Sequence, residues 1–351
     1  MYLTIIINIL LFVLILGVIV FVHEFGHFIL AKWNGVYVYE FALGMGPKIW
    51  GFKKGETEYN LRAIPIGGFC QLAGEDLDTD DDKKIPKEKR LQNKKPWQRF
   101  LIMLFGPMNN FILAVILIFL IGLIWGGSTM DPVIYKVDKD TAAYVAGLRS
   151  KDVVVSINNN KIETSDDISL YLAVASTNKK NTIVVERNGE KLTFKVKPKK
   201  VKEEGKETYK YGIAMKQTKT KGFVNAISYT FNKTKSIFKQ MFVTLVYLFT
   251  GRVKLSQLSG PVGIYSIVGE QRSGGLASLI YLTAFLSINV GVINLLPIPA
   301  FDGGHILFII IEKIKGSPVK PELENKIHNI FLILLLILMV IITINDIIRL
   351  F

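Results

Sequence analysis

The chain has 351 residues, of which 50% are hydrophobic and 21% are charged, and its formal net charge is +14. Such length allows two or three structural units, and so many charges in a half-apolar chain are unusual for one soluble domain. The single cysteine, Cys70, excludes a disulfide-stabilised scaffold, and we expect it to be a packing residue. Long stretches without Asp, Glu, Lys or Arg exclude a purely soluble enzyme, and they lie at 1–22, 101–130, 279–301 and 329–345.

The first of these stretches predicts a membrane-spanning helix over residues 1–32, because about 17 apolar residues can cross the hydrocarbon of a bilayer. No basic residue precedes it and no small-residue cleavage site follows it, so we interpret it as a retained helix rather than a signal peptide. Near its end lies the motif His23-Glu24-Phe25-Gly26-His27. A spacing of four places both imidazoles on one helix face, where they can bind one metal ion, and Glu24 lies one step around the helix.

This motif is typical of zinc-dependent amide hydrolysis. Zinc lowers the pKa of water towards about 7, and a neighbouring carboxylate can take the proton and return it to the leaving amine. Ionisable side chains within an apolar span are costly and usually serve a function, so we favour this interpretation over two histidines that only form hydrogen bonds. A catalytic zinc ion normally has three protein ligands, so a third must come from elsewhere in the chain.

Residues 33–99 predict a polar region with a small β-sheet against the membrane and a linker. Short strands are expected at 37–41 and 57–64, and the glycine and proline residues at 44–47 and 65–68 predict turns. The acidic and then basic stretch 76–95 predicts an exposed linker.

A second spanning helix is expected at 100–128, and the domain that follows, 129–222, is the only stretch able to bury a soluble core. Its strand at 133–137, its β-branched segment at 152–158 and its hairpin closed by Asn188-Gly189 predict a small α+β domain. The order of these elements closely resembles a bacterial PDZ domain, present in one copy. Its charges are mixed in sign and lack a nucleic-acid signature, so we expect no nucleic-acid partner.

Residues 223–278 predict an amphipathic, interfacial segment. Basic residues lie here among aromatic ones, which favours a helix at an anionic lipid surface; they are Lys233, Lys235, Lys239, Arg252 and Lys254. Within this segment, 240–251 is apolar but only about 12 residues long, so it is more consistent with an interfacial or re-entrant position than with a span.

The last third of the chain predicts two spanning helices, at 279–301 and 329–351, with a loop at 302–328 between them. Pro297 and Pro299 break the helical pattern, and Gly303-Gly304 permits close backbone approach, which requires protein or water around this segment. Asp302 lies here and is our candidate for the third zinc ligand, although a solvated loop would explain this segment equally well by itself.

Basic residues concentrate in two loops, 32–99 and 312–326, and are nearly absent from the chain ends. The positive-inside rule therefore places these loops in the cytoplasm, and both termini and the 129–222 domain outside. The predicted fold is a polytopic α-helical membrane protein of about four spanning helices, with a small membrane-associated β-sheet and an inserted α+β PDZ-like domain.

The zinc motif at 23–27, the segment 294–304 and the PDZ-like insert together resemble the site-2 protease family. The likeness is closest to the bacterial regulator-of-sigma-E protease group of zinc metalloproteases, which cleave transmembrane segments. The resemblance extends along essentially the whole chain, and further similar segments lie at 41–47, 65–69, 106–111 and 258–263. One PDZ-like domain rather than two is closer to the Gram-positive pattern.

The resemblance implies a site in which His23, His27 and Asp302 bind Zn²⁺ and Glu24 is the general base. It also implies that Asn294 and Asn110 lie near the substrate, where they would stabilise an oxyanion or hold the unwound peptide; amides that bridge helices are the alternative. Gly44 and Gly46 resemble the family's membrane-associated β-loop, thought to pair with the substrate as an added strand. His305 is expected to form hydrogen bonds and His328 to lie at the interface.

The implied function is regulated intramembrane proteolysis in the bacterial inner membrane. The enzyme would cut single-pass proteins, such as anti-sigma factors or remnant signal peptides, after an upstream site-1-type protease had cut them outside. The PDZ-like domain would act outside as a size filter or terminus binder. A catalytically inactive PDZ scaffold is disfavoured by the intact motif, and a metal transporter by the presence of one cluster rather than a path of ligands.

Overall fold

The computed structural model describes residues 2–75, 82–203, 206–215, 218–252 and 258–350, and the chain divides into two compact units. One unit combines Met1–Leu117 with Leu255–Phe351, and the other is Ile118–Lys254. Among the described residues, four helices are long and apolar enough to cross a membrane; they are Tyr2–Trp33, Pro96–Gly126, Leu276–Asn294 and Glu322–Arg349. The chain is therefore a polytopic helical membrane protein, as predicted.

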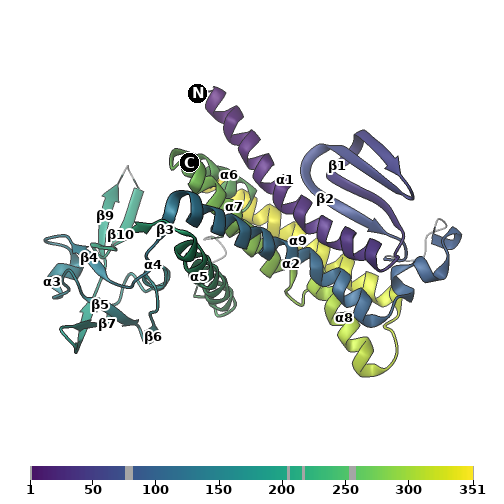
Figure 1. Ribbon diagram of the computed structural model, residues 1–351. Helices are drawn as coiled ribbons and strands as arrows, with labels where there is room; N and C mark the ends of the chain where they lie inside the picture. Colours follow the sequence, from purple (N-terminus) through teal and green to yellow (C-terminus); the bar gives the residue numbers. More distant parts are fainter. Residues whose placement is uncertain (1, 76–81, 204–205, 216–217, 253–257, 351) are drawn as a thin grey trace. The chain divides into compact units, whose positions relative to one another are not determined.

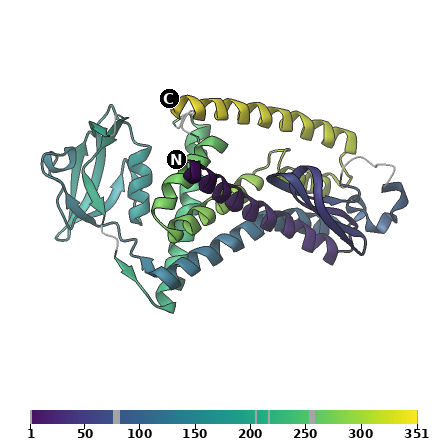
Figure 2. The same cartoon turned by 90° about the horizontal axis from the view of Figure 1, so that it is seen from above.

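The helices of the first unit are labelled in Figure 1. They are α1 (Tyr2–Trp33), α2 (Pro96–Ile121, followed by a π-helical turn at Gly122–Gly126), α6 (Pro261–Ser273), α7 (Leu276–Asn294), α8 (Asp302–Lys315) and α9 (Pro321–Leu350). Ile15 and Ile19 of α1 pack with Val268 of α6 and Leu282 of α7 in a common apolar core. The C-terminal end of α9 lies beside α6 (Figure 2), where Asp346 accepts hydrogen bonds from the backbone N–H groups of Gly260 and Gly263.

The predicted third span, 279–301, is too long at its C-terminal end, because α7 ends at Asn294. Pro297 and Pro299 cannot donate backbone hydrogen bonds, so the chain leaves the helix through an irregular turn. The predicted zinc-ligand loop, 302–328, is also wrong, since Asp302 is the first residue of α8 and α9 begins at Pro321. Gly303 allows α8 to begin directly against this turn, because a Cβ atom there would overlap the carbonyl oxygen of Leu296.

The polar region after α1 contains a long antiparallel hairpin rather than two short strands. Strand β1 (Val38–Lys54) pairs with β2 (Thr57–Leu72), and the predicted turns at 44–47 and 65–68 lie within these strands. The pairing register shifts repeatedly along the hairpin. Glycines with positive φ angles permit this irregular ladder, in which other residues would be strained; they are Gly44 (85°), Gly46 (81°) and Gly67 (84°). The hairpin lies beside α1 (Figure 1).

Most of the described residues in the predicted linker are exposed, as expected, but they are not irregular chain. Residues 82–93 form three short 3₁₀ turns, and Leu91 is buried in the core shared by the hairpin, α1 and α2. The side chain of Asp82 accepts hydrogen bonds from the hydroxyl of Tyr39 and the backbone N–H of Gly74. These contacts fix 82–95 against the end of the hairpin, while residues 76–81 lie outside the described part of the chain.

The second unit contains the predicted α+β domain. A four-stranded antiparallel sheet has the order β6-β5-β7-β8, with smaller pairs β4 with β11, β9 with β10 and β3 with β12. The strands are β3 (Gly127–Ser128), β4 (Ile134–Val137), β5 (Val153–Ile157), β6 (Asn160–Lys161), β7 (Asn181–Arg187), β8 (Glu190–Val196), β9 (Lys199–Glu203), β10 (Lys206–Lys210), β11 (Ile213–Met215) and β12 (Lys219–Thr220). Asn188 and Gly189, both with positive φ, close the β7–β8 hairpin as predicted.

Helices α3 (Ala142–Val145), α4 (Ser165–Ala173) and α5 (Phe223–Phe249) complete this unit. The lysines of α5 form ion pairs within this unit. Lys233 pairs with Asp166 at 2.7 Å, Lys235 with Glu163 at 3.0 Å and Lys239 with Asp167 at 3.0 Å. The position of this segment at a lipid surface stays a prediction, and Lys254 lies outside the described residues.

Candidate metal centre

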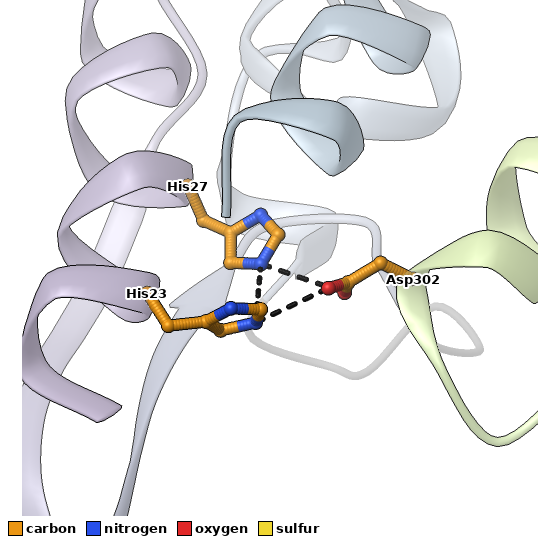
Figure 3. Close-up of side chains that lie close together, drawn as sticks. All are labelled: His23, His27 and Asp302. Atoms are coloured by element: carbon orange, nitrogen blue, oxygen red, sulfur yellow. Dashed lines mark hydrogen bonds and ion pairs between the residues drawn. The ribbon is translucent and has the colours of Figure 1, made fainter. Parts of the chain in front are cut away.

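Three predicted ligands from two distant parts of the chain meet in the first unit (Figure 3). Nε2 of His23 lies 3.1 Å from Oδ2 of Asp302, Nε2 of His27 lies 3.4 Å from Oδ1 of Asp302, and the two Nε2 atoms are 3.3 Å apart. Both imidazoles project from the same face of α1, and Asp302 projects from the first turn of α8. Both histidines are only 7% exposed.

These distances fit a zinc ion. Two ligand atoms at about 2.0–2.1 Å from zinc, separated by a tetrahedral angle, lie about 3.4 Å apart. The observed separations of 3.1–3.4 Å match this spacing, and two imidazoles with one carboxylate form a common catalytic ligand set. Among the described residues, this is the one group of three or more His, Cys, Asp or Glu side chains close enough to hold an ion.

Helix α2 orients His27. The Nδ1–H group of His27 donates a hydrogen bond of 2.9 Å to the carbonyl oxygen of Ile102, which leaves Nε2 available as a ligand. The imidazole lies directly over Gly106, where a Cβ atom would overlap the ring. Gly26 is equally constrained, because a Cβ atom there would overlap the carbonyl group of Phe105. The two glycines therefore let α1 and α2 cross closely enough for the hydrogen bond to form.

Helix α2 also contacts His23, through Asn110. The Nδ2 atom of Asn110 lies 3.2 Å from Nδ1 of His23, and Asn110 is completely buried. Its backbone carbonyl accepts a hydrogen bond of 2.8 Å from the hydroxyl of Ser287 on α7. Asn109, its neighbour, donates to the carbonyl of Val22 at 3.2 Å.

Glu24 lies on the side of α1 that faces the hairpin. Its carboxylate accepts a hydrogen bond from the backbone of Cys70 in β2, and a Cβ atom on Gly68 would be 3.6 Å from its Cγ atom. The charges of both histidines and Asp302 act on it, which places the carboxylate beside the three ligands. Burial raises the pKa of the Cys70 thiol, and its side chain lies in an apolar core, so the expected packing role of Cys70 is confirmed.

The remaining candidate substrate-binding residues lie on the hairpin and at the end of α7. Gly44 and Gly46 lie in β1, and the carbonyl of Gly46 accepts a hydrogen bond of 2.6 Å from Arg62. Asn294 is the last residue of α7, directly before the irregular turn that leads to Asp302. An apolar groove runs between α1 and the hairpin, lined by Leu14, Val18, Phe21, Leu43, Leu61 and Pro65.

His305 and His328 lie outside the three-ligand group. Nδ1 of His305 is 3.4 Å from Oε1 of Glu324, and the ring of His328 lies 5.4 Å from that of His305. These contacts join α8 to the beginning of α9, which confirms a polar bonding role for His305.

Sequence reasoning missed three features that shape the site. They are the Ile102 carbonyl, the contact of Asn110 with an imidazole, and the backbone group of Cys70 that holds Glu24. The small residues at 26, 68 and 106 were the available signal, since each marks a place where another segment approaches closely.

Comparison with known proteins identifies the family of the chain. The model of peptidase family M50 matches residues 11–338, and the chain belongs to this family. Regulator of sigma-W protease RasP of Bacillus subtilis is 33% identical, with 97% of this chain and 98% of that protein covered. A zinc metalloprotease of Clostridium perfringens is 38% identical, with 94% and 95% covered. Zinc metalloprotease RasP of Bacillus licheniformis is 33% identical, with 97% and 98% covered.

The family identifies the protein as a membrane metalloprotease of the site-2 type. The predicted resemblance and the predicted enzyme class are thereby confirmed, in preference to an inactive scaffold.

Proposed function

We propose that the protein is an intramembrane zinc endopeptidase that hydrolyses peptide bonds in the transmembrane segments of single-pass proteins. The observation that carries this proposal is the meeting of three side chains, from α1 and α8, whose ligand atoms lie within 4.8 Å of one another inside a unit of apolar helices. His23 and His27 are buried on a helix long and apolar enough to cross a membrane, which favours a substrate peptide that enters from the membrane.

His23, His27 and Asp302 would hold the zinc ion, and Glu24 would be the general base. Zinc bound there supplies Lewis acidity, which polarises the scissile carbonyl and makes water easier to deprotonate. The Glu24 carboxylate takes the proton of the attacking water and then donates it to the leaving amide nitrogen. The hydrogen bond from the backbone of Cys70 holds this carboxylate in position on the hairpin side of α1.

The hairpin and the apolar groove provide a path for the substrate. A transmembrane helix must unwind before hydrolysis, because its own hydrogen bonds and side chains shield each peptide bond. The groove beside Leu43 suits an apolar segment, and the irregular stretch of β1 at Gly44 and Gly46 would pair with the unwound segment as an added strand. Asn294, at the end of α7, would hold the peptide or stabilise the oxyanion.

The 129–222 domain is proposed to be a PDZ-like domain on the extracytoplasmic side of the bacterial inner membrane, acting as a size filter or terminus binder. Its four-stranded sheet and the capped helix α4 support the assignment. The similarity to the regulator of sigma-W protease RasP favours a sigma-factor pathway, in which the substrate would be an anti-sigma factor already cut outside by a site-1-type protease. Remnant signal peptides are the other proposed substrate class.

The test is cleavage of a single-pass substrate by the full chain in liposomes. Glu24→Gln should retain zinc and lose about 10²–10⁴-fold in cleavage rate, because it removes the general base and leaves the ligands in place. Glu58→Gln is the matched control: this exposed hairpin glutamate pairs with Lys48 at 3.3 Å, and its loss should leave cleavage unchanged. Cleavage at the normal rate by zinc-loaded Glu24→Gln would overturn the assignment.

A further inference from the structure

Among the described residues, Asn110 is the side chain that contacts Nδ1 of His23, and this contact has no part in the proposed chemistry. Its amide lies at 3.2 Å from the ring nitrogen, on a residue that is completely buried. The Oδ1 atom of the same amide finds no hydrogen-bond partner among the described residues. The hydroxyl of Ser287 holds the backbone of Asn110 from α7, so the amide cannot move far from the imidazole.

The position of the hydrogen on His23 decides whether the ring can bind a metal ion. Nε2 faces Asp302 at 3.1 Å and His27 at 3.3 Å, so Nε2 is the ligand atom. A neutral imidazole carries one hydrogen, and the nitrogen that binds the metal must not carry it. The hydrogen of a zinc-bound His23 therefore lies on Nδ1 and needs an acceptor there.

An asparagine amide can satisfy Nδ1 in either form of the ring. With Nδ2 towards His23 it donates to a bare Nδ1, and after a 180° turn about χ2 it accepts from Nδ1–H through Oδ1. We propose that Asn110 is a positioning residue that accepts the Nδ1 hydrogen of His23 and so holds Nε2 ready for the metal ion. This inference rests on the proposed zinc site, and it assigns Asn110 to the metal ligand instead of to the substrate.

The two histidines would then be oriented by acceptors of different kinds. His27 has a fixed backbone acceptor, the carbonyl of Ile102, which favours a single tautomer. His23 has a side-chain amide that can follow the ring between its two tautomers. Partners of this sort that hydrogen-bond to a metal ligand typically contribute about 10–100-fold to metal affinity.

The experiment measures zinc affinity of the purified full chain by competition with a chelator. Asn110→Leu removes the acceptor at similar volume and should weaken zinc binding about 10–100-fold. Asn110→Asp keeps an acceptor and should bind zinc at least as tightly as the unmodified chain. Asn109→Leu is the matched control, because Asn109 donates to the Val22 carbonyl and does not contact a ligand, so its zinc affinity should stay within about twofold.

Cobalt substitution gives a readout that a merely structural role would not change. The visible spectrum of the Co²⁺-loaded chain should be altered by Asn110→Leu and retained by Asn110→Asp. Normal zinc affinity in Asn110→Leu, with a raised KM for the substrate, would overturn the inference and return Asn110 to the substrate. If Asn110→Leu does not fold, a tenfold weaker zinc affinity in folded Asn110→Asp would also overturn it. Failure of the proposed function is distinguishable, since the unmodified chain would then bind no zinc or would bind zinc without cutting the substrate, whatever the effect of Asn110→Leu on zinc affinity.

Discussion

The metal centre and the seam between α4 and α5 both bring charged groups together from distant parts of the sequence, but they are built differently. At the metal centre, His23, His27 and Asp302 are enclosed by helices that touch at glycines. At the seam, three lysines meet three carboxylates along an edge of the domain that is partly open to solvent.

The two sites differ in how well they tolerate a substitution. Each group of the metal centre has several fixed partners, and close backbone contacts leave no room for adjustment, so one added methyl group should disrupt it. The seam divides its energy among several solvent-screened pairs, each of which contributes about 1 kcal/mol or less. The predictions below follow this order of tolerance, from the largest expected effect to the smallest.

Gly106→Ala should have the largest effect. The new methyl group would overlap the imidazole of His27, so the ring must leave its position between Ile102 and Asp302. We expect at least about a 100-fold loss of zinc affinity, measured by chelator competition, because a ligand is displaced. Gly17→Ala on α1 is the control, since nothing lies within 4 Å of its Cβ position, and its zinc content should be normal. Normal zinc affinity in Gly106→Ala would show that the crossing of α1 and α2 is not the constraint.

The seam should respond moderately to Asp166→Asn. Asp166 accepts hydrogen bonds from Lys233 at 2.7 Å and from the hydroxyl of Ser236 at 2.9 Å, and all three side chains are largely shielded from solvent. We expect a loss of about 1–2 kcal/mol in the stability of the α5 contact, read from the rate of limited proteolysis. Glu163→Gln, in a more exposed pair with Lys235, should cost less than about 0.5 kcal/mol. Equal effects of the two variants would contradict this ranking.

A single ion pair on the hairpin should give the smallest effect, visible at low pH. Burial raises the pKa of Glu40, but hydrogen bonds from Arg62 and Asn60 outweigh it and hold the pKa below its usual value. A carboxylate with a lowered pKa stabilises the fold above the unfolded-state pKa of about 4.3, and this stability is lost as pH falls below it. In Glu40→Gln, the free energy of unfolding should therefore fall less on acidification than in the unmodified chain, by about 1 kcal/mol or less. An unchanged acid transition would show that the Glu40–Arg62 pair does not contribute to stability.

Local patterns in the sequence predicted what depends on local geometry. The spacing of His23 and His27 sufficed for two ligands on one face, and charge-free stretches were enough to locate the spanning helices. Asp302 was selected because it is a carboxylate among helix-breaking residues, although its helical position at the start of α8 was missed.

Contacts between distant segments could not be predicted in this way. Gly44 and Gly46 were interpreted as turn residues, because a sequence does not reveal whether a positive φ angle serves a turn or an irregular strand. The carboxylate partners of the α5 lysines were not predicted, since they lie about 70 residues earlier in the chain. Orienting groups such as the Ile102 carbonyl are backbone atoms, which every residue type has, so the sequence does not reveal them.

The most direct test of the metal centre is the zinc content of the purified chain and of two variants. One zinc ion per chain is predicted for the unmodified protein and for Glu24→Gln, which changes no ligand. Asp302→Ala should lose most of its zinc, because it removes the carboxylate whose two oxygens lie 3.1 Å from His23 and 3.4 Å from His27. Full zinc content in Asp302→Ala would contradict the claim that α1 and α8 together form the metal centre.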